Sequence, residues 1–213
     1  MAQKPRAAYH TAKLARYPLI DIDVQMARRF LTQYHYLKDR RFRHMAIYAL
    51  HVPDVPDGIG GVIVFHSPSA PETVVGAFGL QRTEQQGIFE LGRLAMHPSF
   101  NGSNYTSYFV GRSIRRLRAQ MLPTTPVRAI ISYADSGIGH IGGIYRATNA
   151  FYCGLSNQKY DFWVNGKIQQ RGKTRGVDGE WKPRSRKHRW VWVFDETLGL
   201  RWQVTQLPSH LAS

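Results

Sequence analysis

The chain of 213 residues is 43% hydrophobic and carries a formal charge of +15 at neutral pH. This length allows one substantial hydrophobic core and is short for two full domains. So large a charge opposes compaction unless an anionic partner offsets it, and nucleic acid is the commonest such partner. A single cysteine, Cys153, excludes a disulfide framework and a multi-cysteine metal site, and no apolar run is long enough to span a bilayer.

The amino-terminal part predicts a basic arm followed by one domain. Residues 1–20 lack periodicity and contain Lys and Arg without any acid, so we expect a flexible arm there and a single domain over residues 21–213. Apolar residues then recur at helical spacing from Val24 to Tyr34, with Asp21 or Asp23 as the helix cap. The aromatic and basic mixture that follows suits a nucleic-acid contact, although a solvated last turn accounts for the same residues.

Four strands are predicted next. Residues 45–52, 60–67 and 73–81 are rich in β-branched and aromatic residues, and their short connections predict an antiparallel meander. The fourth strand covers residues 88–97 and is interrupted by Arg93. An arginine in an apolar strand is costly unless it is paired, so Arg93 either pairs with Glu90 or points into a site that holds an anion.

A basic helix is predicted behind a loop of small residues. The loop spans residues 97–107, and Ser103 or Thr106 is the expected helix cap. The start of a helix behind such a loop favours anions. Four arginines within residues 112–118 either contact phosphates or form a solvated face.

The next strand and helix contain most of the candidate chemistry. Residues 127–135 form a short apolar run that ends in Tyr133 and Asp135, and polar residues at the carboxyl end of a buried strand are those that a site recruits. Residues 136–152 predict a glycine-interrupted helix that carries His140 and Tyr145. Asp135 and His140 suit an acid–base pair; alternatively, Asp135 caps the helix and His140 lies at the surface.

The carboxyl-terminal part predicts a basic β-hairpin region. Asn165–Gly166 between alternating residues is typical of a type I′ turn, and residues 188–195 predict the closing strand. From Lys159 to Arg189, ten Lys or Arg residues stand against three acids, a local formal charge of +7. Together with the cations in residues 28–43 and 112–118, this segment provides enough basic surface for a groove that follows phosphates.

Three motifs resemble the Mom family of phage Mu and related phages: HYLKDRR at 35–41, ELGRLAM at 90–96 and YADSGIGHIGGIYRATNAFYCG at 133–154. The order of elements also resembles the Gcn5-related N-acetyltransferase (GNAT) fold. The resemblance implies an α/β (α+β) fold with a mixed, mostly antiparallel sheet flanked by helices. It implies an enzyme of the bacterial host cytoplasm that adds a carbamoylmethyl (acetamido) group to N6 of adenine in double-stranded DNA and so protects phage DNA from restriction.

One departure bears on the cofactor. The glycine pair of the acetyltransferase phosphate loop is missing from NGSNYTSYF at 101–109, which disfavours ordinary coenzyme A binding and leaves the group donor unknown. Iron has been linked to the family, so His35 and Asp135 are candidate metal ligands, although their spacing matches no metal motif. No membrane contact is expected, and the oligomeric state stays open, with a homodimer as one expectation.

The resemblance and the residue chemistry together predict a site. In the expected mechanism an adenine is flipped out of the duplex, Asp135 with His140 orients its amine or accepts its proton, and Tyr145 protonates the leaving group. Arg93 and Ser107 are expected to hold the donor. The expected substrate- and DNA-binding residues are His35, Tyr36, Lys38, Arg40, Arg41, Tyr105, Arg112, Arg115, Tyr133, Arg171, Lys173 and Arg175.

Two other functions fit the same sequence. One is a coenzyme A-dependent acetyltransferase that acts on a small amine, a protein or RNA. The other is a basic DNA-binding protein without catalysis, but such a protein needs neither an arginine within a strand nor an aspartate at a strand end.

Overall fold

The protein has a mixed α/β fold, seen in a computed structural model that describes residues 16–38, 41–100, 104–169, 174 and 176–208. Within these residues a seven-stranded sheet has the order β1-β2-β3-β4-β5-β10-β6, and a small sheet has the order β8-β7-β9. Neighbouring strands are antiparallel except β4 and β5, which are parallel. The predicted fold class is confirmed.

The main sheet is built from β1 (Leu19–Asp21), β2 (Ala46–His51), β3 (Ile59–His66), β4 (Ile88–Met96), β5 (Ala129–Asp135), β6 (Phe151–Leu155) and β10 (Lys187–Val193). The small sheet is built from β7 (Tyr160–Val164), β8 (Lys167–Ile168) and β9 (Glu180–Pro183). The helices are α2 (Val24–Tyr34), α3 (Pro71–Phe78), α4 (Tyr105–Met121) and α5 (Gly143–Arg146).

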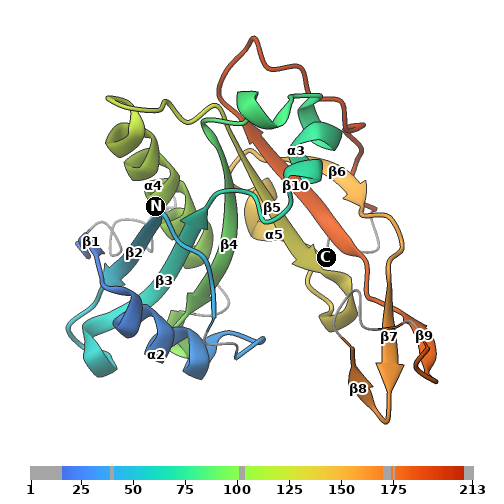
Figure 1. Cartoon of the computed structure of the whole chain (residues 1–213). Helices are drawn as coiled ribbons and strands as arrows, with labels where there is room; N and C mark the ends of the chain where they lie inside the picture. Colours follow the sequence, from blue (N-terminus) through green and yellow to red (C-terminus); the bar gives the residue numbers. More distant parts are fainter. Residues whose placement is uncertain (1–15, 39–40, 101–103, 170–173, 175, 209–213) are drawn as a thin grey trace.

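The main sheet splits between its two parallel strands. Residues 88–91 of β4 pair with residues 129–132 of β5, and beyond them the strands diverge towards the bottom of Figure 1. A β-bulge accompanies the split: the register with β3 passes from Leu91 to Arg93, which leaves Gly92 unpaired. A Cβ atom on Gly92 would lie 2.0 Å from the ring of His66, so only glycine fits. Because a bulge bends its strand, Gly92 helps to turn β4 away from β5.

Helices cover both faces of the sheet and leave the split open. On one face, Phe109 and Leu117 of α4 and Tyr145 of α5 pack in a single core with strands from both halves of the sheet. On the other face the cores are separate. Leu31 of α2 packs over β2 and β3, and Val74 of α3 packs over β5 and β10. The split opens towards the bottom of Figure 1, with α2 on one side and the small sheet on the other.

The last residues of the segment predicted as an arm, residues 1–20, belong to the fold. Residues 1–15 lie outside the described residues, but Leu19 and Ile20 already belong to β1 and pair with β2. Arg112 of α4 donates a 2.8 Å hydrogen bond to the carbonyl of Tyr17, and Arg116 donates to that of Leu19. Two arginines of the basic helix thus hold this segment against the fold.

The first helix agrees with the sequence prediction. Asp23 is the cap of α2, because its Oδ1 accepts hydrogen bonds of 2.7 and 2.8 Å from the amides of Gln25 and Met26. Asp21, the other candidate cap, instead forms an ion pair with Arg116. The capped end fixes where α2 begins, and the helix ends at Tyr34, so that His35 and Tyr36 follow directly after it.

Two predicted elements are wrong. Residues 73–81 are not a strand: most of them belong to helix α3, which starts at Pro71 and ends before Gly79 with φ +73°. The meander consists of β2, β3 and β4 instead. The predicted helix over 136–152 is reduced to α5, because Gly139 and Gly142 adopt positive φ and Phe151 already begins β6. Asn104 precedes α4, so Thr106 is not its cap, and Ser103 lies outside the described residues.

The carboxyl-terminal hairpin is confirmed. Asn165 and Gly166 both have positive φ, 47° and 73°, as a type I′ turn requires, and they join β7 to β8. The predicted closing strand, β10, does not lie at the edge of the sheet: it is inserted between β5 and β6. Arg171, Lys173 and Arg175 lie outside the described residues.

Candidate active site

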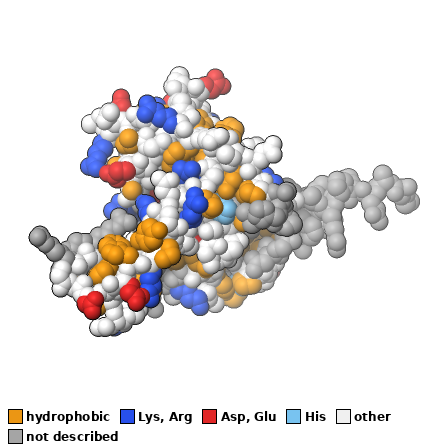
Figure 2. All heavy atoms as spheres, turned by 90° about the vertical axis from the view of Figure 1, so that its right-hand side faces the viewer, with side chains coloured by type: hydrophobic (Ala, Val, Ile, Leu, Met, Phe, Trp, Pro, Cys, Tyr) orange, Lys and Arg blue, Asp and Glu red, His pale blue; other side chains and the backbone are white. Residues whose placement is uncertain are grey.

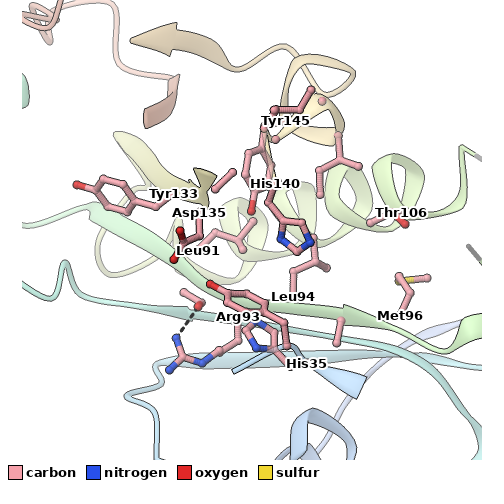
Figure 3. Close-up of a pocket in the computed structure, with 18 of the residues that line it drawn as sticks. His35, Leu91, Arg93, Leu94, Met96, Thr106, Tyr133, Asp135, His140 and Tyr145 are labelled. Carbon is pink, nitrogen blue, oxygen red and sulfur yellow. Dashed lines mark hydrogen bonds between the residues drawn. The ribbon is translucent and has the colours of Figure 1, made fainter. Parts of the chain in front are cut away.

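A cavity of about 610 Å³ occupies the split between β4 and β5. It is lined by the diverging part of β4, the end of β5, residues 139–145 and residues 34–36 after α2 (Figure 3). Its volume lies within the range of small-molecule sites, roughly 300–1,000 Å³. With Thr106 of α4 also in its lining, the cavity collects side chains from distant stretches of the sequence.

Many of the predicted site residues line this cavity: His35, Tyr36, Arg93, Tyr133, Asp135, His140 and Tyr145. The ring of Tyr36, which is 41% exposed, stacks on His35 with centroids 4.5 Å apart. It also meets His140 edge-on at 5.3 Å. These contacts join the end of α2 to the glycine-rich segment across the split.

Asp135 ends β5 and keeps part of its carboxylate for a ligand. Its Oδ1 accepts a 2.9 Å hydrogen bond from the amide of Gly137, and the amide of His140 donates to the Asp135 carbonyl at 3.0 Å. Among the described residues, no hydrogen bond joins the Asp135 carboxylate to the His140 ring. The local role of Asp135 as a turn cap is thus present, while the side-chain pair expected with His140 is not formed.

Tyr145 points its hydroxyl into the cavity (Figure 3). Burial raises the pKa of this phenol, despite a hydrogen bond to the side chain of Ser132 that lowers it, so the group is protonated at neutral pH. Ser132 is fully buried and donates a 3.1 Å hydrogen bond to the carbonyl of Leu91, at the last paired position before the split. Sequence reasoning missed Ser132; a hydroxyl inside the apolar run of β5 was the available signal.

Arg93 lies in the cavity wall without a carboxylate partner. One of its terminal nitrogens donates a 2.8 Å hydrogen bond to the carbonyl of Gly92, and its buried Nε has no recorded partner among the described residues. The alternative partner, Glu90, accepts a 2.9 Å hydrogen bond from the amide of Ser69. The geometry thus favours the interpretation of Arg93 as a residue available to an anion.

His35 is a neutral hydrogen-bond donor in this site. Burial first, and then nearby Arg93 and His140, lower the pKa of its imidazole from 6.5 to about 4. Its Nδ1 accepts a 3.2 Å hydrogen bond from the amide of Leu37, so the proton of the neutral ring resides on Nε2. An Nε2–H group is a donor to a ligand and not a proton acceptor.

The buried imidazole predicts a pH-dependent stability. Between pH 6.5 and 4 the unfolded chain binds a proton at His35 that the folded protein does not, so the free energy of unfolding falls as pH is lowered through this window. From pH 7 to 4.5 the His35 contribution amounts to about 2 kcal/mol. Urea denaturation of the wild type and His35→Gln at both pH values measures it: the wild type should lose more stability than the variant. Equal losses would contradict a neutral, buried His35.

A metal site is not supported within the described part of the chain. No three His, Cys, Asp or Glu side chains there are grouped so that they could hold a metal ion. His35 already uses Nδ1, and Asp135 already uses Oδ1, for backbone amides. The metal role expected for these two residues therefore finds no third ligand among the described residues.

Other predicted residues lie away from the split. Ser107 donates a 3.0 Å hydrogen bond to the carbonyl of Asn104 and, with Arg115, borders a second cavity of about 620 Å³ between α4 and residues 147–149. Tyr105 packs edge-on against Phe100 at 5.4 Å. Arg112 is engaged with Tyr17, as described above. Lys38 and Arg41 are exposed after α2, and Arg40 lies outside the described residues.

The sheet divides between two parallel strands and holds a cavity in the division, as the resemblance to the Gcn5-related N-acetyltransferases predicts. A model of the Mom protein family matches residues 16–208, and the chain belongs to this family. A search of curated protein sequences found no match.

Solved acetyltransferase structures are similar in fold at low sequence identity. A Bacillus subtilis acetyltransferase in complex with CoA has a TM-score of 0.47 and 13% identity, covering 84% of this chain and 98% of that one. Arabidopsis thaliana NAA60 in complex with acetyl-CoA has a TM-score of 0.49 and 8% identity, covering 83% and 98%. The putative acetyltransferase yncA from Salmonella typhimurium, with its cofactor acetyl-CoA, has a TM-score of 0.49 and 11% identity, covering 85% and 95%.

These comparisons correct the cofactor prediction. All three similar structures contain coenzyme A or acetyl-coenzyme A, which overturns the expectation that disfavoured coenzyme A and named iron. The sequence argument depended on a missing glycine pair in the loop before α4. Backbone amides in the first turn of a helix bind phosphate whether or not glycines precede them, so the missing pair was a weak reason. In the part of the chain that the structure describes, no helix is long and apolar enough to cross a membrane.

Proposed function

We propose that the protein transfers a carbamoylmethyl (acetamido) group to N6 of adenine in double-stranded DNA and so protects phage DNA from restriction. The observation that supports this most is the convergence of Asp135, Tyr145 and Arg93 in the split of a protein with a formal charge of +15. A carboxylate, a protonated phenol and a guanidinium are the groups that amine attack on an activated donor requires.

The second cavity fits a coenzyme A derivative. It lies beside the first turn of α4, and the start of a helix favours an anion such as a phosphate group. The Arg115 side chain and the Ser107 hydroxyl border the same cavity. A coenzyme A derivative, when bound, would supply the activated group. Residues of the split then act on the amine and on the leaving group.

The split offers a place for an extruded adenine. An amino group engaged in base pairing is hard to reach, so the base is expected to leave the duplex. The exposed ring of Tyr36 provides a stacking surface at the cavity wall. The free oxygen of Asp135 would accept a hydrogen bond from N6 and then its proton. N6 would form a bond to the donor carbon while the bond from that carbon to the coenzyme A sulfur breaks, and the hydroxyl of Tyr145 would protonate the departing sulfur. Arg93 and His35 Nε2–H would hold an oxygen atom of the donor.

Basic surfaces flank the opening of the split. Helix α2 lies on one side of it and the small sheet on the other (Figure 1). On α2, Arg28 and Arg29 line a surface hollow, and the buried Nε of Arg28 has no recorded partner among the described residues. Cations on both sides of the opening suit a duplex laid across it, with phosphates on either side of the extruded base.

Phosphate contacts predict salt-sensitive DNA binding. Because each neutralised phosphate releases counterions, the logarithm of the binding constant should fall linearly with the logarithm of salt concentration. Replacing the exposed Arg29 by glutamine should weaken binding to all duplex sequences alike and reduce this slope by about 1. Titrations of a labelled duplex at several salt concentrations measure both effects. Arg82→Gln, which removes an arginine already paired with Glu72, is the control. A binding constant that does not change with salt concentration would contradict double-stranded DNA as the substrate.

Nucleoside mass spectrometry tests the proposed reaction. DNA from bacteria that express the protein is digested to nucleosides and compared with DNA from the same host carrying an empty vector. A deoxyadenosine with the mass of an added carbamoylmethyl group, found only with the protein, is the expected result. The mass of an added acetyl group would instead indicate a simple acetyl donor. An established enzyme of this kind, expressed in the same host, is the positive control. If the control modifies the DNA and this protein leaves the nucleosides unchanged, the proposal is overturned.

A further inference from the structure

The small sheet β8-β7-β9 adjoins the candidate active site. It leaves the main sheet through residues 156–159 after β6 and returns through residues 184–186 before β10. Lys187, the first residue of β10, pairs with Asp135. The amide and hydroxyl of Ser136 donate to the carbonyl of Arg186 at 3.1 and 2.7 Å. Few residues therefore separate this sheet from the wall of the cavity.

Aromatic side chains are exposed on one face of the small sheet. Trp181 of β9 is 62% exposed and Tyr160 of β7 is 53% exposed. Trp181 lies opposite Phe162 in the register, and the two rings pack with centroids 5.1 Å apart. Because Phe162 is buried, it supports the tryptophan from below. The indole is thus held in place while much of its surface stays open to a partner.

A hollow with a polar rim lies over these rings. Its volume is about 710 Å³, and Trp181, Tyr160 and Phe162 line it. Polar side chains complete the lining: Gln158, Lys159, Asp161, Gln169 and Thr174. An exposed aromatic ring with hydrogen-bonding groups around it suits a planar polar ring better than an alkyl chain.

Cations surround this face. Lys159 borders the hollow, and Lys167 of β8 is exposed nearby. Figure 2 looks onto the side that carries β7 and β9 and shows exposed hydrophobic side chains beside Lys and Arg. Stacking rings among cations are the combination that binds single-stranded nucleic acid, since bases stack and phosphates pair with the cations.

We propose that this sheet face binds a nucleic acid by stacking an unpaired base on Trp181, with nearby lysines contacting the phosphates. The inference rests on the proposed function and adds a second contact to it. Extruding an adenine leaves its partner base unpaired and its neighbours without one stacking contact. A stacking surface beside the active site offsets that loss and keeps the opened duplex in place.

Binding of labelled oligonucleotides tests the stacking role. Fluorescence anisotropy at one fixed salt concentration compares a single strand and a fully paired duplex, for the wild type, Trp181→Ala, Trp181→Phe and Phe151→Ala. We expect Trp181→Ala to weaken single-strand binding by about 5- to 150-fold and duplex binding far less. Trp181→Phe keeps a stacking ring and should retain most of the affinity. Phe151, 47% exposed on β6, is the matched control for loss of an exposed aromatic ring and should have little effect.

The alternatives give distinct results. Equal single-strand affinity for the wild type and Trp181→Ala, with both folded by circular dichroism, would overturn the stacking surface. A change from dimer to monomer in light scattering on Trp181→Ala would also overturn it, because the face would then bind a second copy of the chain. If adenine modification continues in either case, the proposed function stands without this contact. Should the wild type bind neither oligonucleotide, both proposals fail together.

Discussion

Replacing Asp135 by asparagine should lower the rate of adenine modification by about 10²- to 10⁴-fold, the usual contribution of one general acid or base. Asparagine keeps an oxygen that can accept the hydrogen bond from the Gly137 amide, so the turn after β5 is expected to persist. The substitution removes only the capacity to take a proton from N6. The initial rate of appearance of modified deoxyadenosine per molecule of expressed protein is the quantity to measure.

DNA affinity provides the control for this variant. Asp135 lines the cavity and does not belong to the basic surface proposed to contact phosphates, so duplex binding should change little in Asp135→Asn. A variant with wild-type rate and wild-type stability would reduce Asp135 to its structural role as a cap. A variant that loses stability together with activity would assign the effect to the turn, and Asp135→Glu would then show whether a carboxylate nearby restores the rate.

Replacing Trp190 by alanine should lower the free energy of unfolding by about 3–5 kcal/mol, as expected when a large buried aromatic side chain is truncated. Trp190 is 1% exposed and belongs to β10, which pairs with β5 on one side and β6 on the other. Its indole nitrogen donates a 2.9 Å hydrogen bond to the carbonyl of Ile141. Its ring packs against Tyr145 and Tyr152 at 6.1 and 5.0 Å. Chemical denaturation followed by circular dichroism measures the loss.

The same substitution at Trp181 is the matched control, because that tryptophan is mostly exposed. Trp181→Ala should cost much less stability than Trp190→Ala. Trp190→Ala should also disturb the candidate active site, since Trp190 holds the segment that carries His140 and packs on Tyr145. If both variants lost similar amounts of stability, the main core would depend on Trp190 less than the burial of this residue indicates.

Local signals in the sequence predicted several elements correctly. The helix α2 follows from apolar periodicity and the Asp23 cap, and the hairpin between β7 and β8 follows from Asn165–Gly166, because both signals act over a few residues. Helix α3 was mistaken for a strand since its short run of apolar residues suits either structure. The insertion of β10 between β5 and β6 depends on contacts between distant parts of the chain, which no local pattern reports.

The candidate site was also predicted only in part, because local patterns mark some of its residues and long-range packing decides the position of the others. Asp135 and Tyr133 could be found because polar residues at the end of a buried strand are conspicuous, and Arg93 because it interrupts a strand. Ser107 was expected to act with them, but it lies beside another cavity. The distance between α4 and the split depends on how the helix packs. The hydrogen bond from Ser132 across the last β4–β5 pair depends on the strand order, which the sequence did not reveal.

The division of the sheet has a mechanical consequence. The two halves are paired directly through four residue pairs between β4 and β5, and a continuous core under α4 joins them on one face. On the opposite face, separate cores under α2 and α3 leave the halves unconnected across the opening. The two halves are therefore joined through a continuous core on the face of α4, and only through the parallel pair on the face of α2 and α3. A force that separates the two halves is therefore expected to act first on the face of α2 and α3, where no continuous core resists it.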